Sequence, residues 1–168
     1  MKKILSAILA CLMVAVLASC AVGDTTPAET TSAVNTAVQV IFKVGEETIY
    51  ELDITVNGDA PVVMDAVKTI IKEKAVDIAI SEGGDKIAHA DKYRDCTLTI
   101  DGKDVSFYWN FELNGKASEK ADEQPIKEGD VITFVFTRGG LNAEDKLEEV
   151  PYDPSTNEYY DPEAVTEA

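Results

Sequence analysis

The sequence has few of the residues on which most catalytic and metal sites depend. Its 168 residues include one histidine, three cysteines and one tryptophan, and only 15 basic residues stand against 31 acidic ones. Nucleic-acid-binding proteins need clustered lysine and arginine, so the net charge of −16 argues against that class. It also disfavours docking on an anionic membrane surface. The length excludes a large multidomain enzyme, and carboxylate or calcium chemistry stays open.

The first nineteen residues have the features of an export signal. A short basic start, residues 1–3, precedes a run from Ile4 to Ala18 whose only polar residue is Ser6. A transmembrane helix needs about 20 apolar residues, so this shorter run favours a signal peptide over residues 1–19. The run ends in Leu17-Ala18-Ser19-Cys20, which resembles the lipobox of bacterial lipoproteins.

The lipobox resemblance implies cleavage before Cys20 and lipidation of its thiol, which would anchor the mature chain at the extracytoplasmic face of the cell membrane. The alternative is a plain secretory signal followed by a chance cysteine. With Cys11 removed and Cys20 lipidated, only Cys96 would remain, which excludes an intramolecular disulfide. Cys96 alternates with Leu98 and Ile100, a pattern that favours a buried apolar residue over a nucleophile.

The mature chain divides into three zones by composition. Residues 20–37 are rich in Thr, Ala, Ser and Pro and are predicted to form a flexible tether. Residues 38–138 hold nearly all of the periodic hydrophobic pattern and are predicted to form the folded domain. Residues 139–168 contain nine acidic residues and one basic residue, which predicts a disordered acidic tail. The alternative for the tail is docking as an extended segment through its Tyr-Asp-Pro repeat, at residues 152–154 and 160–162.

Alternating apolar residues predict strands on both sides of one helix. Residues 38–44 and 50–56 alternate around Gly45 and predict a β-hairpin. An apolar stripe with helical spacing follows over residues 63–71, with Asp59 as its expected cap. Residues 76–80 either prolong this helix or begin an extended segment. Strands over 96–100, 105–113 and 131–136 complete the order β-β-α-β-β-β, which predicts an α+β fold with one helix packed on a mostly antiparallel or mixed sheet.

Two stretches of the domain resemble a known family. Residues 107–116 read FYWNFELNGK, and residues 126–132 read IKEGDVI. An aromatic strand that ends in Asn-Gly, followed by Gly-Asp before the last strand, is similar to the small β-rich domain that closes transcobalamin and intrinsic factor. The domain also occurs in many bacterial surface proteins. The resemblance covers about residues 38–137 and implies a β-grasp-like fold with a corrinoid as a candidate ligand. In the cobalamin carriers a separate helical barrel holds most of the ligand, and this chain has no segment long enough to be one.

The candidate ligand residues are on and beside the aromatic strand. Trp109 belongs to an apolar stripe, which favours core packing over stacking on a ligand. Tyr108 and Asn110 point to the opposite face, and with Asn114 at the following turn they are placed for recognition. His89 is expected in an exposed loop, and neither a phosphate loop nor a Ser-His-Asp arrangement is evident. The sequence therefore predicts a non-catalytic, lipid-anchored binding module for a small cofactor-like ligand. The alternative is a surface module that binds another protein.

Overall fold

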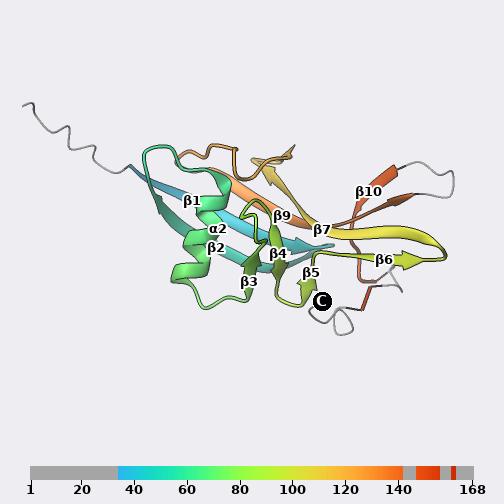
Figure 1. Cartoon of the computed structure of the whole chain (residues 1–168). Coiled ribbons are helices and arrows are strands. Elements are labelled where there is room, and N and C mark those ends of the chain that lie inside the picture. The colour runs from blue at the N-terminus through green and yellow to red at the C-terminus, as the bar shows by residue number, and fades with distance from the viewer. Residues whose placement is uncertain (1–33, 142–146, 156–159, 162–168) are drawn as a thin grey trace, which may run out of the picture. The chain divides into compact units, whose positions relative to one another are not determined.

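The computed structural model describes residues 34–141, 147–155 and 160–161. The predicted signal peptide, Cys20 and nearly all of the predicted tether lie outside these residues. The first strand, β1, spans Asn35–Val44, so the end of the predicted tether, residues 35–37, belongs to the fold rather than to the linker. Figure 1 gives the labels of the helix and strands used below.

The largest sheet contains seven of the described strands. Its main path runs β2 (Glu47–Asn57), β1, β9 (Val131–Leu141), β7 (Lys103–Leu113) and β6 (Cys96–Ile100). β1 and β9 are parallel, whereas the other neighbours along this path are antiparallel. Two short strands flank the path: β8 (Lys116–Ser118) pairs with β7, and β10 (Leu147–Pro151) pairs with β9. The mixed sheet and its helix confirm the predicted α+β class.

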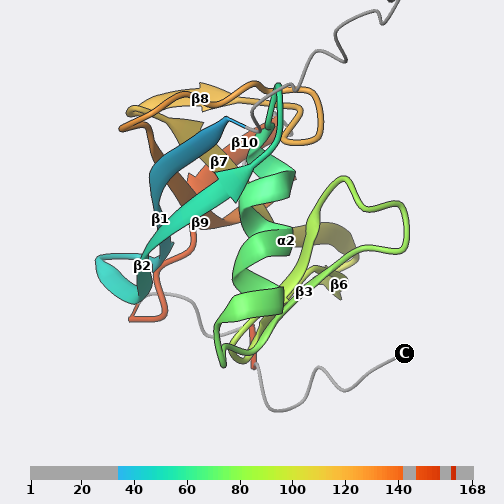
Figure 2. The same ribbon diagram turned by 90° about the vertical axis from the view of Figure 1, so that its left-hand side faces the viewer.

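The helix, α2 (Val63–Glu73), covers one face of this sheet because its apolar residues recur with helical spacing. Five of them are buried: Val63, Met64, Ala66, Val67 and Ile70. The helix stands upright beside β2 in Figure 2. The predicted cap at Asp59 is wrong. The helix begins after Val62, whose backbone N–H donates to Asp65 Oδ2 at 3.1 Å.

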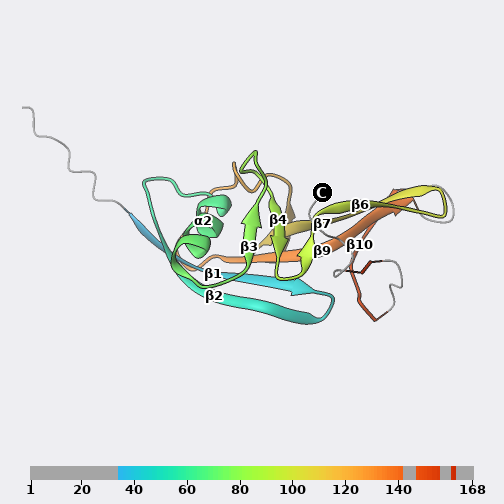
Figure 3. The ribbon, with the colours of Figure 1, turned by 60° about the horizontal axis from the view of Figure 1, so that its bottom comes forward.

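A second, three-stranded sheet follows the helix. It consists of β3 (Ile78–Ile80), β4 (Ile87–Ala90) and β5 (Tyr93–Arg94), paired in that order and antiparallel. Residues 76–80 therefore begin an extended segment and do not prolong the helix. Figure 3 shows that this small sheet and α2 lie on the same side of the long strands. His89 lies within β4, so its expected place in an exposed loop is wrong.

The main core lies between the large sheet and the layer formed by α2 and the small sheet. Alternate residues of the central strands are buried there, as the period of two requires: Val38, Val40, Phe42 and Val44 of β1, Val105, Phe107, Trp109 and Phe111 of β7, and Ile132, Phe134 and Phe136 of β9. Phe42 stacks on Phe134 with ring centroids 4.8 Å apart. The predicted strand alternation is confirmed for these three strands.

The predicted boundary at Arg138 and the predicted disordered tail need correction. β9 continues to Leu141, and β10 pairs antiparallel with its second half. Tyr152 and Tyr160, the tyrosines of the two Tyr-Asp-Pro units, are 3% and 5% exposed and pack on Phe107 and Phe136. We call residues 147–155 and 160–161 the C-terminal strap. Burial of the two rings outweighs the acidic composition around them, because the carboxylates can stay in water while the rings enter the core.

Candidate functional site

Strand β7 has a short stretch that lacks a partner on one side. β9 pairs with Ser106–Leu113 along one edge of β7. On the other edge, β6 pairs with Lys103–Phe107 and β8 pairs with Phe111–Leu113. Within the described ranges, no strand pairs with Tyr108–Asn110 on that second edge. We call this stretch the β7 gap.

A cavity of about 420 Å³ lies at the β7 gap. Its apolar lining comes from both layers of the fold and from the segment after β8: Met64, Ile87, Trp109, Phe111, Ala121 and Phe134. Ala121 is held there because its carbonyl accepts a hydrogen bond from the Met64 N–H at 3.0 Å, at the first turn of α2. Cavities of about 300–1,000 Å³ with such linings are typical of small-molecule sites.

Charged side chains line the cavity at its solvent-exposed rim. Asp85, Asp95 and Glu119 are acidic, and Lys86 is basic, so the charged lining sums to −2. A hydrogen bond from Ser81 is the largest cause that lowers the pKa of Asp85. Asp95 is exposed, but the surrounding protein removes part of its hydration, which raises its pKa, and Lys86 opposes that shift. The rim therefore favours a cationic or neutral ligand over an anionic one.

Trp109, one of the predicted ligand residues, lines this cavity. It is 8% exposed, and its indole N–H donates to the Tyr93 carbonyl at 3.3 Å. Its ring packs on Phe42 and Phe136, with centroids 5.6 and 5.1 Å away. Trp109 is thus a core residue, as its apolar stripe predicted, and it also lines the cavity, whereas its stacking on a ligand stays a prediction.

Tyr108 also lines the cavity, but its hydroxyl has a structural partner. The hydroxyl donates to Glu149 Oε1 of β10 at 2.5 Å. Burial, followed by this bond to a carboxylate, raises the pKa of Tyr108 to about 12. The ring lies directly over Gly139 of β9, where a Cβ atom would be 2.9 Å from Tyr108 Cε1. A side chain at Gly139 would therefore collide with the Tyr108 ring, and β9 continues past both glycines to Leu141.

The two predicted asparagines lie at different places. Asn110 lines the cavity, next to Trp109. Asn114 is not among the residues that line this cavity, and both ends of its amide form hydrogen bonds. Its Oδ1 accepts from the Val131 N–H, and its Nδ2 donates to Asp130 Oδ1, both at 2.9 Å. The structure brings Tyr108, Trp109 and Asn110 together and gives Asn114 the role of joining the β7–β8 turn to β9.

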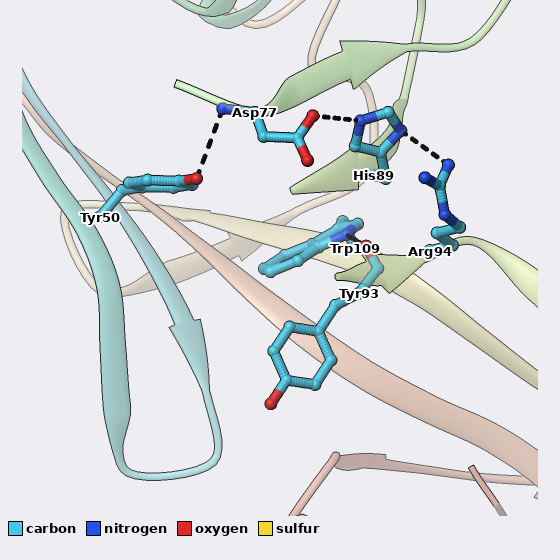
Figure 4. Close-up of polar contacts among 6 residues, drawn as sticks. All are labelled: Tyr50, Asp77, His89, Tyr93, Arg94 and Trp109. Atoms are coloured by element: carbon cyan, nitrogen blue, oxygen red, sulfur yellow. Dashed lines mark hydrogen bonds and ion pairs between the residues drawn. The ribbon is translucent and has the colours of Figure 1, made fainter. Parts of the chain in front are cut away.

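Sequence reasoning missed a chain of polar contacts on the small sheet, which Figure 4 shows. His89 Nε2 lies 3.0 Å from Asp77 Oδ1, and His89 Nδ1 lies 3.3 Å from Arg94 Nη1. Arginine can only donate, so Nδ1 is the acceptor and the proton of the neutral ring is on Nε2. The Tyr50 hydroxyl accepts from the Asp77 N–H at 3.4 Å. No spacing in the sequence indicates this network, because the register of β3, β4 and β5 creates it.

This network has a positioning role. It joins β2 to the three strands of the small sheet, which carries the Tyr93 carbonyl that accepts from Trp109. On the far side, the Tyr160 hydroxyl accepts from the Arg94 N–H at 2.7 Å, so the C-terminal strap ends on the same sheet. None of Asp77, His89 and Arg94 lines the cavity. The sole histidine of the chain is therefore not among the residues that line the cavity.

The environment of Cys96 does not favour a nucleophilic thiolate. Its side chain is half-buried at the start of β6. Burial raises the pKa of its thiol, and the nearby Asp95 carboxylate adds to the effect. A raised pKa reduces the thiolate fraction on which nucleophilic chemistry depends. Among the described residues, no three His, Cys, Asp or Glu side chains gather in the way that metal ligands do.

Comparisons with other proteins do not identify a family for this chain. No family model matches the chain, and searches of curated proteins and of solved structures find no match either. Across the part of the chain that the structure describes, no helix has the length and apolarity that a bilayer crossing requires.

Proposed function

We propose that the chain is a lipid-anchored, extracytoplasmic, non-catalytic binding module, with the cavity at the β7 gap as its binding site. The observation that carries the proposal is the position of this cavity. It reaches the aromatic core at Trp109, Phe111 and Phe134, and it is rimmed by exposed carboxylates. An apolar floor with a few polar groups around it is the usual form of a ligand site. A catalytic role has less support, because neither His89 nor Cys96 lines the cavity.

The lipobox and the fold support the remaining parts of the proposal. Cys20 carries the anchor, and the described module begins at Asn35, so residues 21–34 join the lipid to the first strand. A β-grasp-like architecture is supported by the parallel pairing of β1 with β9 and by one helix packed across the sheet. Such a module, held on the outer surface of a cell, presents its binding site to the surroundings without releasing the protein.

The family resemblance makes a corrinoid one candidate ligand, and the size of the cavity limits how it would bind. A cavity of about 420 Å³ holds a compact molecule or one projecting group of a larger one. A whole corrinoid would need a second surface to complete its site. A protein partner is the second candidate, and the unpaired backbone edge of the β7 gap favours it specifically.

Anchoring is tested by replacing Cys20. Cys20→Ala is expected to block cleavage of the signal peptide, which gel mobility measures. It is also expected to prevent lipid attachment, so that the protein no longer partitions with lipoproteins into the detergent phase. Cys96→Ala is the matched control, because it removes a cysteine that the proposal leaves without lipid. Normal processing and unchanged membrane attachment of Cys20→Ala would refute the lipoprotein assignment.

Ligand capture is tested with the full mature chain and two probes, the neutral dye Nile red and cobinamide. Trp109 is the sole tryptophan and lines the cavity, so its fluorescence reports Nile red directly. Equilibrium dialysis measures cobinamide. Ala121→Leu fills the cavity and is expected to weaken binding at least tenfold, whereas Ala117→Leu, at an exposed position on β8, is the matched control.

A second blocking variant guards against misfolding. Glu119→Phe covers the cavity from its exposed rim without entering the core. Both blocking variants should keep the circular dichroism spectrum of the wild type. The cavity would be refuted as a ligand site if the wild type bound neither probe. It would also be refuted if both blocking variants bound a probe as tightly as the wild type does.

A further inference from the structure

The backbone at the β7 gap has a defined orientation. The turns Asp101-Gly102 and Asn114-Gly115 have positive φ at both residues, between 50° and 77°, which is the form of two-residue hairpin turns. In such hairpins the flanking residues form a hydrogen-bonded pair, here Ile100 with Lys103 and Leu113 with Lys116. Alternation from either turn directs the N–H and C=O of the odd-numbered residues of β7 away from β9. Both turns thus point the backbone groups of Trp109 into the gap.

This orientation fits one residue of an extended chain. A residue placed opposite Trp109 would exchange two hydrogen bonds with it, as in an antiparallel ladder. The neighbouring pairs Cys96–Phe107 and Phe111–Ser118 close the gap on both sides. Only about three residues fit between them at about 3.4 Å per residue. The gap therefore suits a short extended segment and not a long added strand.

The side chain of that residue would enter the cavity. Residues that lie directly opposite each other in a ladder point to the same face of the sheet. Trp109 points to the face covered by α2 and the small sheet, where its ring lines the cavity. The opposing side chain would thus meet Met64, Ile87 and Phe111 below and the carboxylates of the rim above.

The charge of the cavity selects the kind of side chain. Three acidic residues and one basic residue line it, and the whole chain carries −16. Lysine and arginine place an aliphatic stem on apolar surface while the charged end stays at a polar rim. The apolar floor of the cavity would contact the aliphatic stem, and the carboxylates of the rim would contact the charged end.

We propose that the β7 gap binds an extended polypeptide segment, with one residue pairing with the backbone of Trp109 and placing a Lys or Arg side chain in the cavity. The inference rests on the proposed function and names the ligand class of the same site. The module would then bind exposed basic segments of a partner protein. Recognition would combine backbone hydrogen bonds, which give register, with one charged side chain, which gives specificity.

Four blocked peptides test this inference against the full mature chain. The first is acetyl-Thr-Lys-Thr-amide, whose three residues match the length of the gap, and the others have Arg, Glu or Nα-methyl-Lys at the centre. Trp109 fluorescence measures binding, and amide hydrogen exchange at Trp109 measures the backbone pairing. The Lys and Arg peptides are expected to bind and to slow that exchange. The Glu peptide and the N-methyl peptide, which cannot donate to the Trp109 carbonyl, are each expected to bind at least tenfold more weakly.

Two blocking or charge variants and one control variant complete the test. Ala121→Leu is expected to abolish peptide binding, with Ala117→Leu unchanged. Asp85→Asn combined with Asp95→Asn is expected to weaken the Lys peptide severalfold and to narrow its advantage over the Glu peptide. Equal binding of the Lys and Glu peptides, or unchanged binding of the N-methyl peptide, would overturn the inference.

The outcomes also separate this inference from the proposed function. If Nile red or cobinamide binds in an Ala121-dependent way and no peptide binds at millimolar concentration, the polypeptide ligand is refuted and the binding site stands. If neither the small probes nor the peptides bind, both proposals fall.

Discussion

The burial of Tyr160 gives a sharp test of whether the C-terminal strap belongs to the fold. Its ring is 5% exposed and lies 4.8 Å from Phe107 between ring centroids. Its hydroxyl accepts from the Arg94 N–H at 2.7 Å and donates to the Arg94 carbonyl at 3.3 Å. A tyrosine in a disordered acidic tail would make none of these contacts. Substitution at this one position therefore separates the two interpretations by several kcal/mol.

The expected magnitudes follow from what each variant removes. Tyr160→Ala removes a whole buried ring, which costs about 3–5 kcal/mol of unfolding free energy by analogy with other aromatic-to-alanine changes. Tyr160→Phe keeps the ring but leaves the backbone groups of Arg94 without the hydroxyl, which costs about 1–3 kcal/mol. With a urea m-value of about 2 kcal/mol/M, Tyr160→Ala should lower the unfolding midpoint by about 2 M.

Equilibrium urea unfolding of the full mature chain, followed by circular dichroism and by Trp109 fluorescence, measures these changes. Glu148→Gln is the control, because Glu148 is exposed on β10 and its change should stay within about 0.5 kcal/mol. A Tyr160→Ala variant as stable as Glu148→Gln would show that the strap is not docked in solution.

Three further predictions follow from other contacts. Gly139→Ala places a Cβ atom 2.9 Å from the Tyr108 ring and should lower the unfolding free energy measured in urea by about 1–3 kcal/mol. The double variant Gly139→Ala/Tyr108→Ala should lose less stability than the sum of the two single variants, because removing the ring removes the clash. Burial raises the pKa values of Tyr108 and Tyr160 from 10 to about 12, so both ionise more readily in the unfolded chain, and their stabilising contribution is complete below about pH 10 and lost between about pH 10 and 12. Because the chain has six tyrosines, the difference in tyrosinate absorbance between the wild type and Tyr108→Phe or Tyr160→Phe isolates each residue. This difference should rise together with unfolding in that window, and a rise near pH 10 without unfolding would contradict the prediction. Asn114→Ala, at φ 54°, should cost about 1–3 kcal/mol in urea unfolding and leave Nile red affinity unchanged, whereas a loss of dye binding would return Asn114 to the ligand site.

The long elements could be predicted from the sequence because their patterns are local. Alternation over residues 38–44 and 105–113 and the apolar stripe over residues 63–71 each report burial on one face, whatever the partner. The small sheet escaped prediction because its strands are short. Residues 93–94 are too few to show alternation, and β4 has intermediate positions between its buried ends.

The strap and the site depended on information that no local pattern contains. Nine acidic residues in the last zone favour disorder by composition, and only the repeated tyrosines indicated docking. Their burial requires Tyr93, Phe107 and Phe136, which come from three separate strands. The β7 gap arises because β6 and β8 end at different points along β7, which is a property of register. Tyr108, Trp109 and Asn110 were candidate ligand residues from the sequence and line the cavity, but nothing in the sequence indicated the cavity itself.

The pairing of β1 with β9 also has a consequence for export. Residues of these strands meet across a large separation, since Gln39 pairs with Val131. Just before β9, Glu128 accepts a hydrogen bond from the Ala37 N–H, 91 residues away. A chain that crosses a membrane unfolded, as the proposed signal peptide implies, cannot form this central pairing until β9 has emerged. Loop closure over such a distance is slow compared with local hairpin formation. The β1–β2 hairpin would thus keep one edge of β1 unpaired until β9 becomes available.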